Sequence, residues 1–329
     1  MAAALRPDFS CQRSSPASPD EFPEHFYNAT RSRRTRLLSF GKLRPWQQEN
    51  RYIRTGYRPA SHSYLRSLWS ILRLHNETGS IYTHILPAIG FIAAEAYLYT
   101  DFEMQYPEAS WIDKFVFSFF LFTAIACFGI SAVYHTFGNH SKRVSGFLVR
   151  LDYTGIVGLI LGHIVSGTYM VFYCDSRWQA FYSGMLLTLS IKPQKALTLG
   201  GISGAILLSH RFQSLQFRPL RISTFVNFGF SAAAPLIHGT VLLGLQHMVQ
   251  FGLWYYLVES SIHALAVLIY ATRLPESLKP GRFDMWFNSH QIFHSLAVLA
   301  TVIHTLALWN VFDRNYMNNI CRQPAVHVT

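Results

Sequence analysis

Long apolar runs alternate with short polar loops along most of this chain. From about residue 82 onward we distinguish seven runs, at 82–100, 112–136, 152–173, 180–208, 222–245, 251–271 and 290–311. A helix needs about 20 apolar residues to cross the hydrocarbon core of a bilayer. The runs are too long and too continuous for the strands of a membrane barrel. The pattern therefore predicts an all-α polytopic membrane protein, a bundle of seven transmembrane helices.

Composition agrees with this pattern. Half of the 329 residues are hydrophobic and only 14% are charged, against about a quarter in an average soluble domain. These values argue against a soluble enzyme. The net charge of +11 comes from a tail and from short loops, without any RNA- or DNA-binding motif. Nucleic acid is therefore not an expected partner.

The segments that flank the runs differ in character. Residues 1–45 are rich in Ser, Pro and Arg and lack the apolar core of a signal peptide. We expect a disordered basic tail there, either freely solvated or touching anionic lipid. Residues 46–81 mix charges with aromatic residues and are expected to form a juxtamembrane cytoplasmic segment. The seven-helix domain then occupies 82–311, and 312–329 form a short non-cytoplasmic tail.

Loop charge predicts the orientation of the bundle. The even-numbered loops are basic, with Lys142, Arg143, Arg150, Arg211, Arg218, Arg221, Arg273, Lys279 and Arg282. The odd-numbered loops carry few basic residues, and the first is acidic. By the positive-inside rule the N-terminus is cytoplasmic and the C-terminus lies on the far side. This orientation is inverted relative to G-protein-coupled receptors.

Two features of the chain leave alternatives open. The segment Ser190–Thr198 places two lysines and a proline inside the fourth run, which is costly in a membrane. It is a break in the fourth helix, an insertion, or an error in the gene model. The four cysteines have no zinc-like spacing. Cys174 and Cys321 would lie on the same side, where they either pair or remain free thiols.

Ionisable residues inside membrane spans are costly, so each one suggests a function. Those inside the runs are His84, Glu95, Asp152, His163, His238, His263 and His304. A single histidine in a span is more often a satisfied core residue than a ligand. We apply that interpretation to His163, His238, His263 and His304.

A more specific group emerges from the predicted direction of the helices. His135 ends the second helix, Asp152 begins the third, and His290 and His294 begin the seventh, so all four lie near the cytoplasmic edge. His290 and His294 share a helix face and could hold one cation. With His135 they would give three nitrogen ligands, as in catalytic zinc sites, although iron or copper would accept the same ligands. Chance pairing is the competing interpretation in a chain with 15 histidines.

The order of the sequence motifs resembles the progestin and adipoQ receptor family, also called haemolysin III-related or adiponectin-receptor-like. The matching motifs are Gly56–Pro59 (GYRP), His75–His84 (HNETGSIYTH), Ser131–Phe137 (SAVYHTF), Leu151–Ile156 (LDYTGI), the FYC that ends at Cys174, Pro235–Gly239 (PLIHG) and Ser289–His294 (SHQIFH). They extend over about residues 50–311. The arrangement is most similar to the fungal members linked to zinc and sterol homeostasis. Gly79 and Tyr82 depart from the Asn and Trp that the family often has in the first helix.

The resemblance implies a bundle of seven helices with a cytoplasmic N-terminus and one Zn²⁺ ion. It assigns His135, His290 and His294 as metal ligands. It also implies that Asp152 lies near the reacting water and that Ser131 is the serine of the Ser-x-x-x-His motif. The family is associated with hydrolysis of lipid amides, especially ceramides, and with receptor signalling.

Three hypotheses about function follow. The leading one is a zinc-dependent lipid amide hydrolase in which Asp152 accepts a proton from water and Ser131 orients the substrate. The second is a receptor with structural zinc and an unidentified extracellular ligand. The third is a zinc transporter with His163, His238 and His304 along its path. The plasma membrane and the endoplasmic reticulum are both compatible locations.

Overall fold

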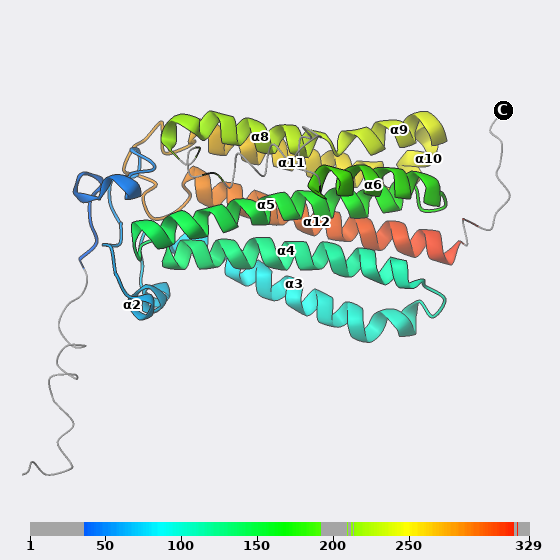
Figure 1. Cartoon of the computed structure of the whole chain (residues 1–329), viewed down its shortest axis with the longest axis horizontal. Helices are drawn as coiled ribbons and strands as arrows, with labels where there is room; N and C mark the ends of the chain where they lie inside the picture. The colour runs from blue at the N-terminus through cyan, green and yellow to red at the C-terminus, as the bar shows by residue number, and fades with distance from the viewer. Residues whose placement is uncertain (1–35, 192–208, 210–211, 213, 319–320, 322–329) are drawn as a thin grey trace, which may run out of the picture. The chain divides into compact units, whose positions relative to one another are not determined.

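A computed structural model of the chain describes residues 36–191, 209, 212, 214–318 and 321. Within these residues all regular elements are helices, apart from an isolated antiparallel bridge between Leu38 and Tyr57. Residues from 37 onward form one compact unit. Its long helices run side by side, with the short elements before residue 78 at one end of them (Figure 1). The prediction of an all-α architecture is therefore confirmed.

Six segments of the described chain are long and apolar enough to cross a membrane. They are α3 (Thr78–Gln105), α4 (Trp111–Phe137), α5 (Lys142–Val171), Leu215–Leu243, α11 (Leu253–Thr272) and α12 (Ser289–Met317). The segment Leu215–Leu243 combines the 3-10 turn η5 (Leu215–Phe217), α8 (Arg218–Phe230) and α9 (Ala233–Leu243), and α10 (Leu245–Gln250) follows it. Each span matches one of the predicted apolar runs.

The remaining run, 180–208, is only partly described. Its start belongs to α6 (Ser176–Ile191), which has 16 residues. Most of the questionable segment Ser190–Thr198 lies outside the described residues. The membrane architecture is thus confirmed for six spans, and the seventh span stays a prediction.

Several helices extend beyond the apolar runs that predicted them. We placed the start of the third run at residue 152, but α5 begins ten residues earlier at Lys142, after an N-cap by Ser141. The first turns of α5 are basic and polar, so hydropathy alone does not detect them. Asp152 therefore lies well inside α5, about 15 Å from its start at 1.5 Å per residue.

The elements before α3 begin earlier than the boundary expected at residue 45. They are η1 (Phe40–Lys42), η2 (Pro45–Gln47), α2 (Tyr64–Trp69) and η3 (Ser70–Leu72). Glu276 and Asp284, both buried, tie this segment to the loop before α12. Asp284 accepts bonds from the backbone N–H groups of Arg54 and Thr55 at 2.9 and 2.8 Å. The segment 46–81 is thus packed onto the helix ends.

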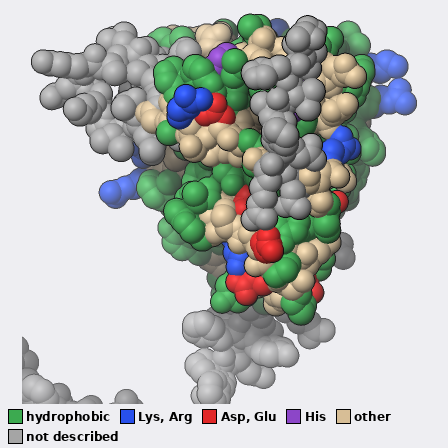
Figure 2. All heavy atoms as spheres, turned by 90° about the vertical axis from the view of Figure 1, so that its right-hand side faces the viewer, with side chains coloured by type: hydrophobic (Ala, Val, Ile, Leu, Met, Phe, Trp, Pro, Cys, Tyr) green, Lys and Arg blue, Asp and Glu red, His purple; other side chains and the backbone are tan. Residues whose placement is uncertain are grey.

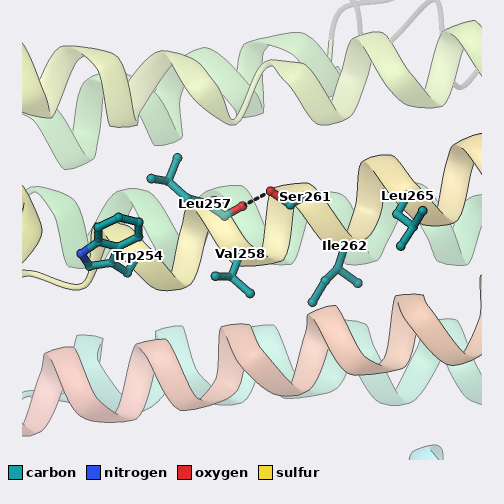
Figure 3. A pocket seen from close by; sticks show the side chains of 6 residues that line it. All are labelled: Trp254, Leu257, Val258, Ser261, Ile262 and Leu265. Carbon is teal, nitrogen blue, oxygen red and sulfur yellow. Dashed lines mark hydrogen bonds between the residues drawn. The ribbon is translucent and has the colours of Figure 1, made fainter.

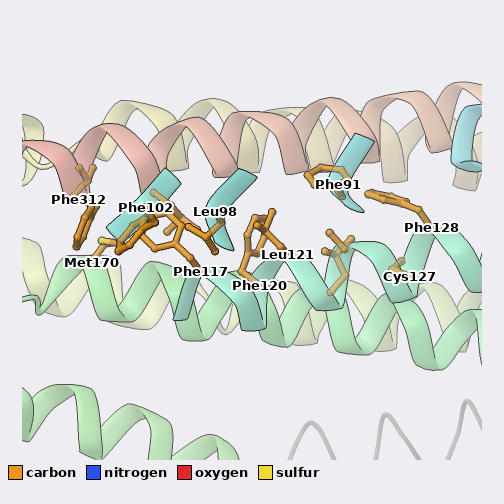
Figure 4. Close-up of a cluster of buried hydrophobic side chains, with 14 of the residues drawn as sticks. Phe91, Leu98, Phe102, Phe117, Phe120, Leu121, Cys127, Phe128, Met170 and Phe312 are labelled. Carbon is orange, nitrogen blue, oxygen red and sulfur yellow. The ribbon is translucent and has the colours of Figure 1, made fainter. Parts of the chain in front are cut away.

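Aromatic side chains fill the core between α3, α4, α5 and α12 (Figure 4). Phe102, Phe120, Phe128 and Phe312 are each no more than 1% exposed. Phe102 contacts the rings of Phe117 and Phe312 with centroids 5.7 and 5.3 Å apart. Such ring pairs contribute about 0.5–1.5 kcal/mol beyond their buried area.

The end of the bundle away from the short elements before α3 contains a disulfide bond between Cys174 and Cys321. Of the two alternatives that the sequence left open, the paired state is therefore the one observed, and Cys127 is a buried free thiol. Acidic side chains lie at this end of the molecule (Figure 2), in agreement with the acidic first loop in the sequence.

The outer surface of the spans is apolar. A depression of 330 Å³ on the outside of α11 is lined by Trp254, Leu257, Val258, Ser261, Ile262 and Leu265 (Figure 3). Its one polar side chain, Ser261, donates a hydrogen bond to the Leu257 carbonyl at 2.8 Å. The depression contains no titratable group, and we interpret it as surface that faces lipid chains.

Close approach of α4 and α5 generates a testable prediction. A Cβ atom on Gly162 would lie 2.1 Å from Thr123 Oγ1 and 3.1 Å from Thr123 Cβ. We expect Gly162→Ala to lower the free energy of unfolding by about 1–3 kcal/mol, the usual cost of overpacking. Gly158→Ala is the matched control on the same helix, because a Cβ there meets nothing within 4 Å. Thermal unfolding in detergent would measure both, and equal midpoints for the two variants would contradict the prediction.

Candidate metal centre

Three histidines from two helix ends converge at one point. His135 lies in the last turn of α4, and His290 and His294 lie in the first turns of α12. One ligand atom from each lies within 4.8 Å of the other two. The Nε2 atoms of His135 and His290 are 3.2 Å apart. The grouping that the sequence predicted is therefore present in the structure.

The start of α12 is fixed by polar contacts around Ser289. Asn288 caps the helix by accepting a hydrogen bond from the Gln291 N–H at 3.1 Å. The buried carboxylate of Glu276 accepts bonds from the backbone N–H and the hydroxyl of Ser289. Helix N-termini leave their first N–H groups unsatisfied, and these acceptors supply the missing partners. His290 and His294 thereby acquire a defined position.

The end of α4 is held by Arg58, from the GYRP motif. Its guanidinium donates to the carbonyls of His135 and Thr136 at 2.5 and 2.9 Å, and to the hydroxyl of Ser70 at 2.7 Å. A cation at a helix C-terminus also interacts favourably with the helix dipole. Burial lowers the pKa of Arg58 to about 10, against the opposing charge of Glu77. Arg58 therefore stays charged at neutral pH and fixes the turn that carries His135.

The outward nitrogens of two of the histidines are occupied. His135 Nδ1 lies 2.8 Å from a carboxylate oxygen of Glu77. His294 Nδ1 lies 3.3 Å from the hydroxyl of Thr83. A ligand histidine generally binds its outward nitrogen to such an acceptor, which fixes the ring and the tautomer. This leaves the other nitrogen of each ring available to a metal.

The spacing between the Nε2 atoms of His135 and His290 fits a metal ion. Two unprotonated Nε2 atoms would repel each other at 3.2 Å, and only a proton or a cation between them relieves this. Ligands bound to tetrahedral zinc at 2.0–2.1 Å are about 3.3 Å apart. The observed separation is close to that value. Three nitrogen donors would leave a fourth coordination position open.

Glu77 was not singled out from the sequence. It precedes α3 directly, and its side chain is 35% exposed. Burial acts to raise the pKa of this carboxyl, but the hydrogen bond from His135 and the nearby histidine and arginine charges hold it well below its usual range. Glu77 is therefore ionised. An acidic residue at the start of a membrane span was the available signal, and it stood within the HNETGSIYTH motif.

Asp152 and Ser131 lie near His135, one of the three histidines. Asp152 on α5 is 7% exposed and Ser131 on α4 is 1% exposed. The Asp152 carboxylate interacts with the Ser131 side chain and electrostatically with His135. The structure thus brings all five sequence-predicted site residues to one end of the bundle.

The first helix contributes two contacts that the sequence did not reveal. The ring of His84 stacks on that of His294, with centroids 3.6 Å apart. Gly79 lies against Gln291, since a Cβ there would be 2.5 Å from Gln291 Cδ. Gln291 in turn donates to the carbonyls of Asn76 and Met285 at 3.2 and 3.0 Å. The departure from the family at Gly79 therefore borders the segment between the two α12 histidines.

Comparison with known proteins agrees with this arrangement. A model of the haemolysin-III related family matches residues 72–305. The chain belongs to the haemolysin-III related family. It is 34% identical to the adiponectin receptor protein of Drosophila melanogaster over 89% of this chain and 64% of that protein. Together with the six spans, this membership shows an integral membrane protein.

Two further relatives belong to the same group. The progestin and adipoQ receptor-like protein 1 of Caenorhabditis elegans is 34% identical over 82% of this chain and 60% of that protein. The ADIPOR-like receptor IZH2 of Saccharomyces cerevisiae is 31% identical over 84% of each chain. The chain thus spans less than two thirds of the two animal relatives. The resemblance to the progestin and adipoQ receptor family is confirmed.

The role of Glu77 can be tested by a conservative substitution. We expect Glu77→Gln to weaken metal binding about 10–100-fold, the usual effect of removing a residue that orients a ligand histidine. Competition between purified protein and a chelator for Zn²⁺ would measure this. Glu103→Gln is the matched control, because Glu103 lies near the far end of α3, the helix that Glu77 precedes, and pairs there with Lys114. Unchanged affinity of the Glu77 variant would show that His135 needs no orienting carboxylate.

Proposed function

We propose that this protein is a zinc-dependent lipid amide hydrolase of the ceramidase type, acting as a receptor-like protein in lipid and zinc homeostasis. The observation that carries the proposal is a group of three imidazoles that would leave one metal position open, with the buried carboxylate of Asp152 interacting with one of them, His135. A purely structural zinc site is usually closed by four protein ligands. Here a buried carboxylate that interacts electrostatically with His135, that of Asp152, is a group that can accept a proton.

The three imidazoles suit zinc. His135, His290 and His294 would hold the ion, with Glu77 and Thr83 on the outward nitrogens. A bound zinc ion supplies Lewis acidity, which polarises a carbonyl group and makes water more acidic. These properties are the ones that amide hydrolysis requires.

The residues around the ligands have separate roles in this proposal. Asp152 accepts the proton of the attacking water as a general base and returns it to the leaving amine. Ser131, in contact with Asp152, keeps the carboxylate oriented. Glu77 holds the ring of His135. Arg58 keeps the last turn of α4 in place through the carbonyls of His135 and Thr136.

The surroundings of the site favour a lipid substrate. A hollow of 560 Å³ is lined by Phe40, Gln48, Glu49, Arg51, Tyr52, Leu215, Arg218, Ala271, Thr272 and Arg273. Its Arg218 lies 4.7 Å above the ring of Tyr270, and that ring lies 5.7 Å from the ring of His290. The hollow thus offers space for a polar head group next to the histidines. Apolar helix surfaces would accommodate the acyl chain.

A cytoplasmic N-terminus is part of the proposal. The basic loops lie at the histidine end of the helices, and cytoplasmic loops carry the excess of Lys and Arg. The disulfide between Cys174 and Cys321 lies at the other end, and disulfides persist in oxidising compartments. Both observations support a site that opens toward the cytoplasm.

The transporter alternative finds less support. Phe120, Ala124 and Phe128 on α4 are buried and follow one another along the helix between the histidine site and the level of His163 and His304. His238 belongs to a different cluster, with its Nδ1 3.1 Å from the Tyr182 hydroxyl. The described residues therefore do not connect the three histidines into a polar path.

One substitution separates the hydrolase from a receptor with structural zinc. In Asp152→Asn the general base is lost while all three imidazoles remain. We expect amide turnover by the purified protein to fall at least 100-fold, with the bound zinc unchanged. Ceramide hydrolysis and elemental analysis on the same sample would measure both. Asp175→Asn, at the disulfide end, is the control that should leave turnover intact.

The opposite results are equally informative. If the purified wild-type protein contains zinc, hydrolyses no lipid amide with or without chelator, and Asp152→Asn signals normally in cells, the zinc is structural and the receptor alternative is correct. If wild-type protein contains no zinc at the three histidines, the hydrolase proposal is wrong.

A further inference from the structure

A second group of ligand-type side chains lies deeper in the bundle. It consists of His163 on α5, Glu259 on α11 and His304 on α12, which are 9%, 8% and 1% exposed. One ligand atom from each lies within 4.8 Å of the other two. From the sequence, both histidines were interpreted as satisfied core residues or, in the transporter hypothesis, as part of a path, and Glu259 was not singled out.

The hydrogen bonds of His163 leave one nitrogen without a partner. Its Nδ1 lies 2.8 Å from the backbone carbonyl of Leu159, so Nδ1 carries the proton. In a neutral ring Nε2 then has only a lone pair. This atom is buried and makes no hydrogen bond. It lies 3.6 Å from a carboxylate oxygen of Glu259. Two acceptors thus face each other.

His304 presents a second lone pair to the same carboxylate. The Ser166 hydroxyl donates to the Gly162 carbonyl at 2.7 Å, so its oxygen accepts the N–H of His304 Nε2 at 2.9 Å. The neutral ring then has its lone pair on Nδ1. That atom lies 2.7 Å from the other carboxylate oxygen of Glu259. A positive charge is required between them.

Rings surround the group, and they include the polar rings of His263, 5.7 Å from that of His163, and Tyr256, 5.8 Å from that of His304. The ring of Phe120 lies 5.2 Å from that of His163 and 4.8 Å from that of His304. An ionised carboxylate in such surroundings is costly unless it is paired. A proton shared between Glu259 and His304 would neutralise that pair. It would leave the lone pair of His163 Nε2 unsatisfied.

We propose that His163, Glu259 and His304 form a second metal site, for a divalent transition-metal ion of the zinc class. One cation satisfies all three acceptors at once, which a single proton cannot do. Two imidazoles and a carboxylate are a ligand set that zinc accepts. The bond from His163 Nδ1 to a backbone carbonyl is the arrangement that orients a metal-binding histidine.

This site is separate from the first. His304 follows His294 by ten residues on the same helix, which corresponds to about 15 Å. The two sites share no ligand. Phe120, Ala124 and Phe128 of α4 lie between them. The metal content of one site can therefore be removed without the other.

Metal content of the purified full-length protein in detergent tests the proposal. We expect two equivalents of zinc per chain in wild type and one in His290→Ala/His294→Ala. Adding Glu259→Gln to that double variant should leave no bound zinc. Glu259→Gln alone should leave one equivalent of zinc per chain. The substitution keeps the shape of the side chain and removes its charge. His238→Ala, outside both groups, is the control and should retain two equivalents.

Other results would overturn the proposal. One equivalent in wild type and none in a folded His290→Ala/His294→Ala variant would show that Glu259 holds only a proton. If that double variant does not fold, wild type and Glu259→Gln can still be compared. Equal zinc content in these two proteins, whether one or two equivalents per chain, would refute the second site. A third result is one equivalent of zinc in wild type that remains in the double variant and is lost in Glu259→Gln. That result would support the second site and contradict the first.

Discussion

Inside a bilayer no water is available to satisfy a polar group, so each one buried between these helices must find its partner within the protein. That constraint gathers the histidines and carboxylates into groups. His135 takes its partner from Glu77, and His304 takes one from Ser166. The remaining lone pairs, on the inward histidine nitrogens and on the Glu259 carboxylate, point at one another. An arrangement of this kind is stable only with a cation or a proton at its centre.

The segment before the first span supplies what the helix ends lack. Arg58 of this segment binds the last carbonyls of α4. Asn50 of the same segment donates to Glu276, in the loop before α12, and Glu276 binds the first N–H of α12. The contact between Asn50 and Glu276 joins parts of the chain that are 226 residues apart. The position of His135 relative to His290 therefore depends on groups outside the membrane spans. The site is built as much by the juxtamembrane segment as by the helices.

Hydropathy predicted the spans because burial in lipid demands long apolar runs, and it placed His135 and His290 correctly at helix ends. It failed at α5, whose basic first turns form helix without being apolar. Hydropathy also could not predict which side chains contact one another. Nothing in the spacing of Glu77 or Glu259 indicates which histidine each one meets, because the packing of α3 against α4 and of α11 against α12 decides this. Family resemblance added the metal, which spacing alone left open.

The proposed metal sites share one helix. His290 and His294 lie at the start of α12 and His304 near its middle. Moving α12 by a single turn, about 5.4 Å, would withdraw ligands from both sites together. A metal ion bound only in the native position stabilises that position by mass action. Two ions would then favour the same placement of α12 against α4, α5 and α11. Occupancy of the deeper site would thus support the geometry that the proposed hydrolytic site requires, although no ligand is common to both.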